Sequence, residues 1–212
     1  MPRSTSAREA KSQRIREALL QACGDLLAQH PIDAITINNI VDAAGVAKGS
    51  FYNHFPDKET LAAAVATGIR LDVERAVEAS NTNVTDPAYK VVRGICNHLQ
   101  LAWSDPRRAT IMLRGHETNS IAESPLNLNI RAHLQEGLAS GRFAPRCEEV
   151  GIIQLIGTTS ASMLRIIEQQ YTLEQAVDFA TRICTLVLCG FGVEEEEATR
   201  ISRGSARDVI KS

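Results

Sequence analysis

The segment Thr36–Phe55, "TINNIVDAAGVAKGSFYNHF", decides the expected fold. Thr36 is placed to cap a helix, and Gly45 can adopt the left-handed conformation that ends one. Phe51 and Phe55 lie four residues apart, so they share one face of a second short helix. The segment therefore predicts two short helices joined by a glycine turn. The first has four apolar residues on one helical face: Ile37, Ile40, Val41 and Ala44.

Two other interpretations of this segment do not fit. A phosphate-binding loop has the pattern G-x-x-x-x-G-K-[ST] between a strand and a helix, whereas Lys48 precedes Gly49 and follows a helix. Catalysis is equally unsupported, since no local nucleophile motif accompanies His54. Cys184 and Cys189 lie five residues apart without a His or Cys cluster near them, which is poor spacing for zinc. We therefore expect no catalytic residue, no metal and no cofactor.

Two short helices around a glycine turn form the helix-turn-helix arrangement, whose second helix enters the major groove of DNA. The side chains suit that role, because Phe51 and Phe55 would pack inward and leave polar side chains outside. Gly49 would permit close approach to a partner, although it weakens the helix by about 1 kcal/mol relative to alanine. The plainer alternative is a surface helix of a helical bundle.

The rest of the chain also has helical periodicity, with no alternating strand pattern and no repeat. The expected fold is all-α with about nine helices. The predicted parts are a helix-turn-helix domain at 1–57 (motif at about 36–55), a connecting helix at 58–80, a second helical domain at 81–193, and an acidic run with a polar tail at 194–212. The second domain is expected to hold helices near 88–103, 106–116, 125–140, 147–170 and 173–191.

The composition is that of an ordinary globular protein. The 212 residues include 44% hydrophobic and 23% charged side chains, with a net charge of −2. No apolar run reaches ~18 residues and no secretory signal opens the chain, so we expect a cytoplasmic protein without a membrane partner. Five scattered cysteines fit reduced thiols. Residues 1–16 carry five basic side chains against one acidic, which favours a surface that meets an anion.

The longer stretch "TINNIVDAAGVAKGSFYNHFPDKETL", Thr36–Leu61, closely resembles the DNA-binding signature of the TetR family of bacterial transcriptional regulators. The match includes the threonine cap, Ala-Gly-Val, Lys-Gly-Ser-Phe-Tyr, His-Phe and the Lys-Glu-x-Leu that opens a long helix. It covers residues 12–61, about a quarter of the chain. Ala47 departs from the pattern, because many members have a serine or threonine there to cap the recognition helix.

The resemblance implies a set of DNA contacts. Lys48, Gly49 and Ser50 would face base edges in the major groove, while Thr36 and Lys58 would bind phosphate. Phosphate contacts fix the register of a protein on DNA, and base contacts specify sequence. The residues assigned to DNA are Thr36, Asn38, Lys48, Gly49, Ser50, Tyr52, Asn53, His54 and Lys58.

The resemblance also implies a C-terminal helical domain at 81–193 that binds a small molecule and forms a homodimer. The last two long helices would pair with those of a second subunit. The residues expected in that interface are Leu173, Val177, Ala180, Ile183, Cys184 and Val187. The residues expected in the ligand pocket are His98, Trp103, Met112, Gln154, Thr158 and Met163.

Taken together, these features predict a ligand-responsive, dimeric regulator of transcription. Most members of the family that it resembles are repressors, which a small molecule releases from a palindromic DNA operator. The alternative from another class is a helical small-molecule-binding protein that never meets DNA. An enzyme is the third class, and no constellation of residues supports it.

Overall fold

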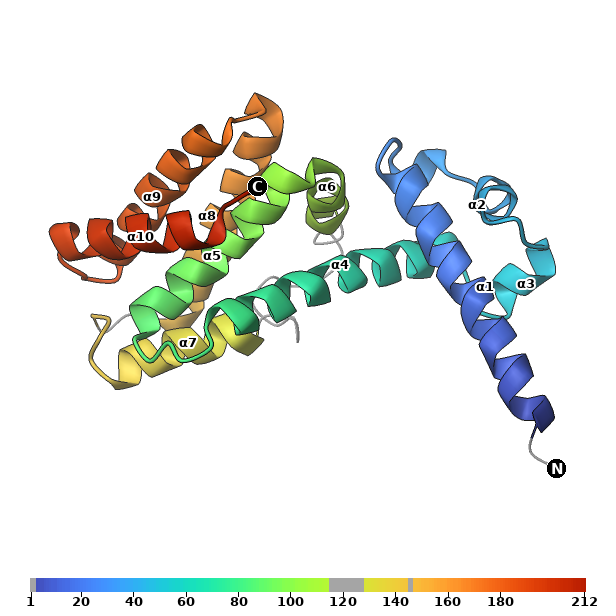
Figure 1. Cartoon of the computed structure of the whole chain (residues 1–212), viewed down its shortest axis with the longest axis horizontal. Helices are drawn as coiled ribbons and strands as arrows, with labels where there is room; N and C mark the ends of the chain where they lie inside the picture. The colour runs from blue at the N-terminus through green and yellow to red at the C-terminus, as the bar shows by residue number, and fades with distance from the viewer. Residues whose placement is uncertain (1–2, 115–127, 145–146) are drawn as a thin grey trace. The chain divides into compact units, whose positions relative to one another are not determined.

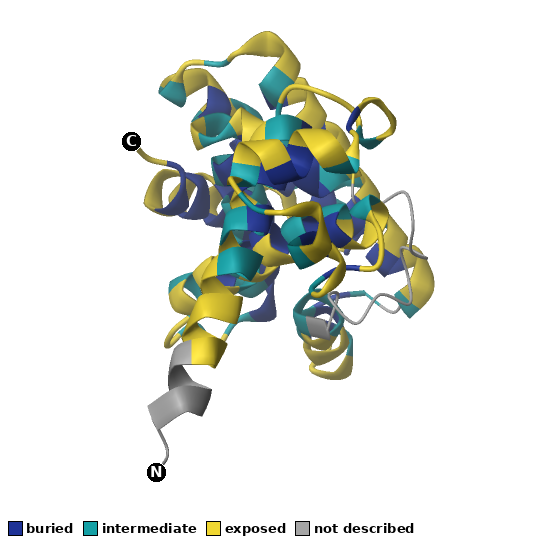
Figure 2. Cartoon of the chain, turned by 90° about the vertical axis from the view of Figure 1, so that its right-hand side faces the viewer, coloured by how far each residue is buried: buried dark blue, intermediate teal, exposed yellow. Residues whose placement is uncertain are grey.

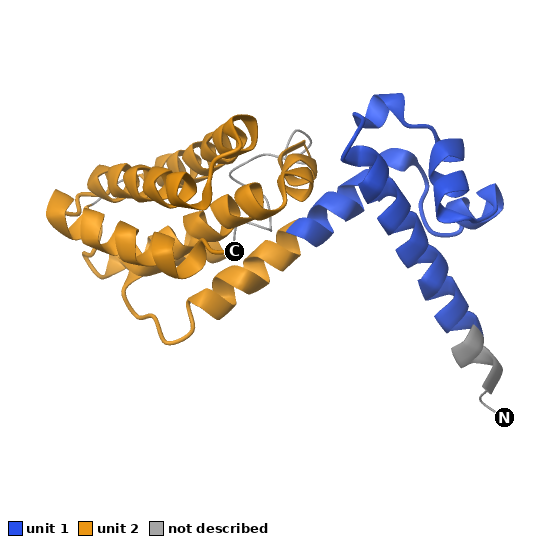
Figure 3. Cartoon of the chain, turned by 45° about the horizontal axis from the view of Figure 1, so that its top comes forward, with its two compact units in different colours: residues 1–69 blue, residues 70–212 orange. Residues whose placement is uncertain are grey.

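The structure is a computed structural model that describes residues 3–114, 128–144 and 147–212. Within those ranges it contains ten α-helices, one short 3-10 helix and no strand, which confirms the all-α prediction. The chain divides into two compact units, residues 1–69 and residues 70–212 (Figure 3). The ends of the predicted helices 106–116 and 125–140 that fall within 115–127 lie outside the described residues.

Unit 1 is a small helical domain in which α1 packs on α2, and α2 on α3 (Figure 1). The long α4 begins in unit 1 and continues into unit 2. The elements of this part are α1 (Arg3–Leu27), the 3-10 helix η1 (Ile32–Ala34), α2 (Ile37–Ala44), α3 (Lys48–Tyr52) and α4 (Lys58–Ser80).

The ends of α2 are set by the two residues that the sequence indicates. The Thr36 hydroxyl accepts a hydrogen bond from the Asn39 backbone N–H at 3.2 Å. The Asn39 side chain in turn accepts from the Thr36 backbone N–H at 2.9 Å, which completes a capping box. At the other end, Gly45 has a φ of 65°, a conformation that favours glycine. These caps fix where the turn between α2 and α3 begins.

Unit 2 is a helical bundle in which α5 contacts α6, α7, α8, α9 and α10. Along the whole chain, dark-blue buried positions alternate with yellow exposed positions on the same helices in Figure 2, as amphipathic helices require. The helices are α5 (Pro87–Ser104), α6 (Pro106–Arg114), α7 (Leu128–Ala139), α8 (Glu148–Gln169), α9 (Leu173–Gly190) and α10 (Glu195–Val209).

Most of residues 194–212, predicted as an acidic run and polar tail, form the additional helix α10 (Glu195–Val209), which packs on α9 and α5. Acidic residues fill its first turn and Arg207 its last, an arrangement that the helix dipole favours. Its inner face is made of small and apolar residues: Ala198, Ile201, Ser202, Ser205, Ala206 and Val209.

An ion-pair network holds the start of α10 to the bundle. Arg142 donates from Nε to Asp86 Oδ1 at 2.9 Å and from Nη2 to Glu197 Oε1 at 2.8 Å. Burial alone would raise the pKa of Asp86, but the hydrogen bonds and the charge of Arg142 lower it. The network therefore connects the N-terminus of α5, the segment after α7 and the N-terminus of α10.

Helix α8 is long and apolar enough to cross a membrane by length and composition. However, 44% of its most apolar window is buried inside the protein, and α8 contacts α5, α6, α7 and α9. Core helices of globular proteins have the same length and composition, so this property is weak evidence for a membrane span.

Candidate functional site

Helix α3 is held in place by two phenylalanines, Phe51 within the helix and Phe55 three residues after its end. Phe51 is fully buried and Phe55 nearly so, and their ring centroids lie 6.3 Å apart. The neighbouring Tyr52 meets Phe51 edge to face at 5.4 Å but stays 53% exposed. The guanidinium of Arg16 lies over the Phe55 ring at 5.4 Å, which connects α1 to the end of α3. The aromatic packing thus leaves the opposite face of α3 open.

The residues that the sequence assigns to DNA are on the surface of unit 1. Six of them are exposed, and Ser50, His54 and Lys58 are half-buried. An open groove brings four together from the starts of α2, α3 and α4. Its lining includes Thr36, Asn38, Lys48 and Lys58, together with the acidic Asp33, Asp57 and Glu59. The five others belong to α3 and the residues that follow it: Gly49, Ser50, Tyr52, Asn53 and His54.

Two features of α3 suit contact with a partner. Ala47 caps the helix without a side-chain hydrogen bond, as the sequence predicts. At Gly49, an added Cβ would have no atom within 4 Å, and the backbone is not in the left-handed region. No contact within the described protein therefore requires glycine at this position. The absence of a side chain leaves space for a molecule that binds to this face of α3.

Lys58, which the sequence assigns to a DNA phosphate, has its ammonium hydrogen-bonded within unit 1. Its ammonium donates to the carbonyl oxygens of Ile32 at 2.9 Å and Ile35 at 2.8 Å. Glu59 Oε1 lies 3.9 Å away. Because an ammonium has three N–H donors, at most one is left for a DNA phosphate. Lys58 thus connects α4 to the loop that precedes α2.

We expect Lys58→Met to destabilise unit 1, because the substitution removes the donor of two hydrogen bonds. A hydrogen bond to a charged group contributes about 1.5–3 kcal/mol, and the methionine keeps most of the side-chain volume. Thermal unfolding followed by circular dichroism should show an earlier transition than in the wild type. Lys48→Met, at an exposed position of α3, is the control and should unfold as the wild type does. Equal stability of the two variants would show that these bonds are unimportant.

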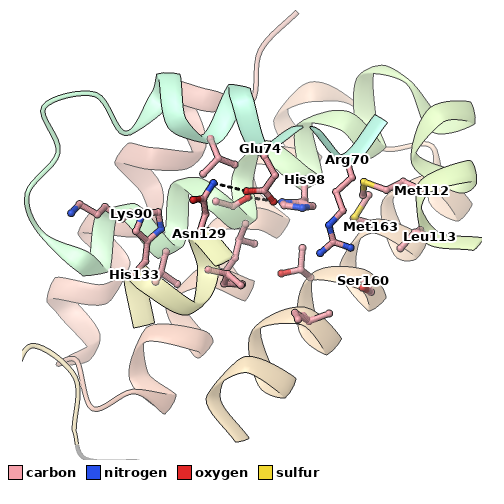
Figure 4. Close-up of a pocket in the computed structure, with 17 residues that line it drawn as sticks. Arg70, Glu74, Lys90, His98, Met112, Leu113, Asn129, His133, Ser160 and Met163 are labelled. Carbon is pink, nitrogen blue, oxygen red and sulfur yellow. Dashed lines mark hydrogen bonds between the residues drawn. The ribbon is translucent and has the colours of Figure 1, made fainter. Parts of the chain in front are cut away.

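A pocket lies within unit 2, between α4, α5, α6, α7 and α8 (Figure 4). Its empty volume, which includes the open mouth, is about 640 Å³. The apolar lining residues are Val77, Val91, Ile95, Met112, Leu113, Ile130, Ile156 and Met163. The polar ones are Arg70, Glu74, Lys90, His98, Asn129, His133, Thr159 and Ser160.

Half of the residues predicted for the pocket line it, namely His98, Met112 and Met163. The others do not. The Trp103 indole donates to the carbonyl of Tyr171 at 3.0 Å and so connects α5 to the loop before α9. The Gln154 side chain lies against Gly190 of α9, where an added Cβ would be 2.7 Å from its Nε2. Thr158 is next to the lining residue Thr159 but is not part of the lining.

Sequence reasoning missed the two charged residues that α4 contributes. Arg70 and Glu74 are four residues apart, so they lie on one face of the helix. That face borders the apolar stripe of α4, which includes the buried Ile69, Val73 and Val77. An acid and a base one turn apart at the border of an apolar stripe is a signal that could have identified this face.

Burial dominates the electrostatics of the pocket. It raises the pKa of Glu74, although the Asn129 amide donates to Glu74 Oε2 at 3.0 Å and Arg70 attracts the carboxylate. Burial also lowers the pKa of His133, with a further lowering from Lys90. Nδ1 of His98 lies 2.9 Å from a backbone carbonyl oxygen, which only accepts, so Nδ1 carries the proton.

The predicted interface residues divide into two sets. Ala180, Cys184 and Val187 are buried in the core of their own chain, so they cannot reach a partner. Leu173, Val177 and Ile183 are half-buried. The periodicity of α9 identifies an apolar face correctly, but most of that face packs on α10 and α5.

A different apolar surface is exposed on α8 and α9. Val150, Ile153 and Leu164 of α8 are each about half exposed, and Leu186 of α9 is 69% exposed. Exposed small residues, including Gly157, continue the α8 stripe at intervals of three or four. Exposed apolar side chains in a contiguous stripe mark a surface for another protein. We call these four large residues the α8–α9 surface.

Among the described residues, no three His, Cys, Asp or Glu side chains gather in a way that would hold a metal ion. Cys96 and Cys184 lie together in the core of unit 2, where a hydrogen bond that the Cys184 thiol donates to Cys96, together with burial, raises the pKa of Cys184. These two thiols therefore have the surroundings of packing residues.

Comparison with known proteins agrees with this geometry. The pattern of the "Bacterial regulatory proteins, tetR family" matches residues 19–65, which include α2, α3 and the start of α4. The transcriptional repressor KstR2 of Rhodococcus jostii is 36% identical over 58 residues, 27% of this chain and 28% of that protein. KstR2 of Mycolicibacterium smegmatis is 24% identical over 61% of this chain and 68% of its own.

The likeness extends to solved structures over nearly the whole chain. The crystal structure of RolR in complex with its ligand resorcinol superimposes with a TM-score of 0.64 and 25% identity. The superposition covers 92% of this chain and 95% of RolR. Both units of the present chain thus have counterparts in a ligand-binding protein of the same architecture.

Proposed function

Because this chain belongs to the TetR family of bacterial regulatory proteins, we propose that it is a ligand-responsive transcriptional repressor. In this proposal a homodimer binds a palindromic DNA operator through α3 and the start of α2. A small molecule enters the pocket of unit 2 and releases the DNA. The observation that carries the DNA part is the exposed polar face of α3, with Gly49 open to solvent.

We propose a separate role for each of the parts predicted from the sequence. Residues 1–57 bind DNA, residues 58–80 connect the parts and contribute Arg70, Glu74 and Val77 to the pocket, and the helical region after them completes the pocket and forms the dimer. Lys48 and Ser50 contact base edges, and Thr36 contacts phosphate. RolR binds resorcinol, which supports a small organic effector here. We place the protein in the cytoplasm, and we propose no enzymatic activity, in line with its relatives.

The dimer that we propose uses the α8–α9 surface. Two recognition helices must reach successive major grooves ~34–36 Å apart to bind a palindrome. Pairing through this surface would cover the side chains of Val150, Ile153, Leu164 and Leu186, which the single chain leaves in water. The small residues between them would let the helices of two subunits approach closely.

Gly49→Ala tests the DNA part of the proposal. Alanine should stabilise α3 by up to about 1 kcal/mol, since its methyl group meets no protein atom. The same methyl group should weaken operator binding, because it fills the space that the DNA needs. Gly204→Ala, at an exposed position of α10 that is equally open, is the matched control. It should leave DNA binding unchanged.

The measurement is fluorescence anisotropy with a duplex selected from random sequences by the protein itself, combined with thermal unfolding. A more stable Gly49→Ala variant that binds this duplex as tightly as the wild type would contradict close approach at α3. Failure of the wild type to select any duplex would favour the alternative, a helical ligand-binding protein that does not act on DNA.

A further inference from the structure

We propose that the effector of the unit 2 pocket carries an uncharged hydrogen-bond donor, in the simplest case a hydroxyl group, which binds to acceptor oxygens of Glu74 and Asn129. The apolar body of the effector then lies against the rest of the pocket. This inference deepens the proposed function and rests on it. It assigns a ligand class to the pocket and a binding role to one residue of α4 and one of α7.

Glu74 reaches the pocket from α4 and can accept more hydrogen bonds than the protein gives it. It is a half-buried lining residue, and its Oε2 accepts a hydrogen bond from the side-chain amide of Asn129 at 3.0 Å. An ionised carboxylate has about four lone-pair sites on its two oxygens and can only accept. The bond from Asn129 occupies one of them, so Glu74 can accept from a ligand as well, in particular at Oε1.

Asn129, at the start of α7, adds a second acceptor. Its Nδ2 lies 3.0 Å from Glu74 Oε2 and 3.3 Å from Glu78 Oε1. Because carboxylates only accept, the atom that faces both of them must be the NH₂ group, which settles the orientation of the amide. Figure 4 shows the Asn129 side chain directed at Glu74. Both N–H groups of the amide are therefore used on carboxylates, and Oδ1 remains as an acceptor.

Glu74 and Asn129 thus present acceptors rather than donors at this end of the pocket. A ligand group that only accepts, such as an ether or an ester, would gain no hydrogen bond from this pair. A hydroxyl group can donate to either oxygen. Sites that are built to hydrogen-bond a hydroxyl discriminate strongly against analogues without it, because polar groups of the site are then left unpaired. The pair should therefore select ligands by their donor.

The immediate surroundings favour an uncharged donor over an ammonium group. Val77 follows Glu74 by three residues on α4, Ile130 follows Asn129 on α7, and both side chains line the pocket. Transfer of a charged group from water to apolar surroundings costs far more free energy than transfer of a hydroxyl. A hydroxyl group can therefore donate to the Glu74 carboxylate at a much lower cost of desolvation.

Burial of Glu74 adds to the gain from such a bond. Removal from water raises the pKa of Glu74, although the bond from Asn129 and the charge of Arg70 lower it. The ionised carboxylate is therefore less well solvated in the pocket than in water. A ligand hydroxyl supplies a hydrogen bond in place of the water that burial removes. Hydrogen bonds to charged groups are stronger than those between neutral groups.

The test uses calorimetric titration of the full-length protein at mildly alkaline pH, where Glu74 is ionised. Each hydroxyl probe is compared with its methyl ether, which keeps the oxygen and loses the donor: phenol with anisole, benzyl alcohol with benzyl methyl ether, and octanol with octyl methyl ether. In at least one pair, the hydroxyl compound should bind the wild type at least about 10-fold more tightly, the lower end for a hydrogen bond to a charged group. Benzylamine, a cationic donor, should bind more weakly than benzyl alcohol.

Substitution of Glu74 then identifies the source of the preference. Glu74→Gln keeps an oxygen for Asn129 and turns an NH₂ group towards the ligand, so the preference for the hydroxyl compound should disappear or reverse. Glu78→Gln is the matched control. It removes the same charge one turn further along α4 from a residue that also contacts Asn129, but Glu78 is exposed and outside the described pocket lining. This control should keep the preference of the wild type.

Thermal unfolding shows whether each variant folds. If Glu74→Gln does not fold, Asn129→Leu tests the second acceptor and should reduce the same preference. Four results would overturn the inference: ethers that bind as tightly as the hydroxyl compounds, benzylamine that binds more tightly than benzyl alcohol, a hydroxyl preference that survives the substitution, or no binding of any hydroxyl compound at millimolar concentration.

Failure of this inference can be distinguished from failure of the proposed function. If an ether or benzylamine binds and releases the operator while the hydroxyl compounds do not, the proposed function stands and the ligand class is wrong. If the free protein binds no specific duplex, the proposed function itself fails.

Discussion

Ile153→Glu combined with Leu186→Glu is expected to produce a monomer that binds operator DNA about 10²–10⁴-fold more weakly than the wild-type dimer. In a dimer, the second recognition helix binds at a high effective concentration, and this gain of about 10²–10⁴-fold is lost when the subunits separate. Both side chains belong to the α8–α9 surface and are at least half exposed. The substitutions should therefore leave the single chain folded while burying charge in any interface formed there.

Sedimentation and fluorescence anisotropy measure the two parts of this expectation on one sample. Leu71→Glu is the matched control, since Leu71 is a comparably exposed leucine on α4, outside the α8–α9 surface. The control should remain a dimer. A double variant that sediments as a dimer and binds operator normally would place the interface elsewhere on the chain.

Phe51→Ala is expected to destabilise the helix-turn-helix by about 3–5 kcal/mol, the usual cost of removing a buried phenylalanine. Phe51 is fully buried and contacts both Tyr52 and Phe55, so its loss leaves a cavity beneath α3. Specific DNA binding should be lost. Unit 2 has its own core, so dimerisation and ligand binding should persist.

Unfolding followed by circular dichroism, together with sedimentation, would separate these effects. Tyr52→Ala is the matched control because Tyr52 is the next aromatic residue and is mostly exposed. It should weaken DNA binding with little change in stability. Equal stability of the Phe51→Ala variant and the wild type would contradict the packing described for α3.

The sequence predicts unit 1 better than unit 2, and the reason is physical. In α2 and α3 the caps, the glycine turn and the spacing of the phenylalanines are local signals within about 20 residues. Thr36 and Gly45 act as their types indicate. Lys58 differs, because its partners Ile32 and Ile35 are backbone carbonyls more than twenty residues away, and a sequence pattern does not reveal them.

In unit 2 the sequence indicates which residues are apolar but not what covers them. The stripe at Ala180, Cys184 and Val187 is equally suited to a partner or to the core, and in the structure it is buried in the core of a unit in which α9 packs on α10 and α5. The sequence does not reveal helix α10, because its composition is charged and its buried face consists mainly of small residues. Trp103 is the single tryptophan and is therefore predicted in the pocket, yet its indole donates a hydrogen bond to the backbone carbonyl of Tyr171.

We propose that the pocket of unit 2 and the DNA surface of unit 1 are coupled through α4. Calorimetric titration of an effector into free protein and into protein bound to its operator measures this coupling. Coupling free energies in allosteric proteins are typically 1–3 kcal/mol, or ~5–150-fold in affinity, and they are reciprocal. We expect operator DNA to weaken effector binding by a factor in this range, and the effector to weaken operator binding by the same factor. Equal effector affinity for the free and DNA-bound protein would contradict it.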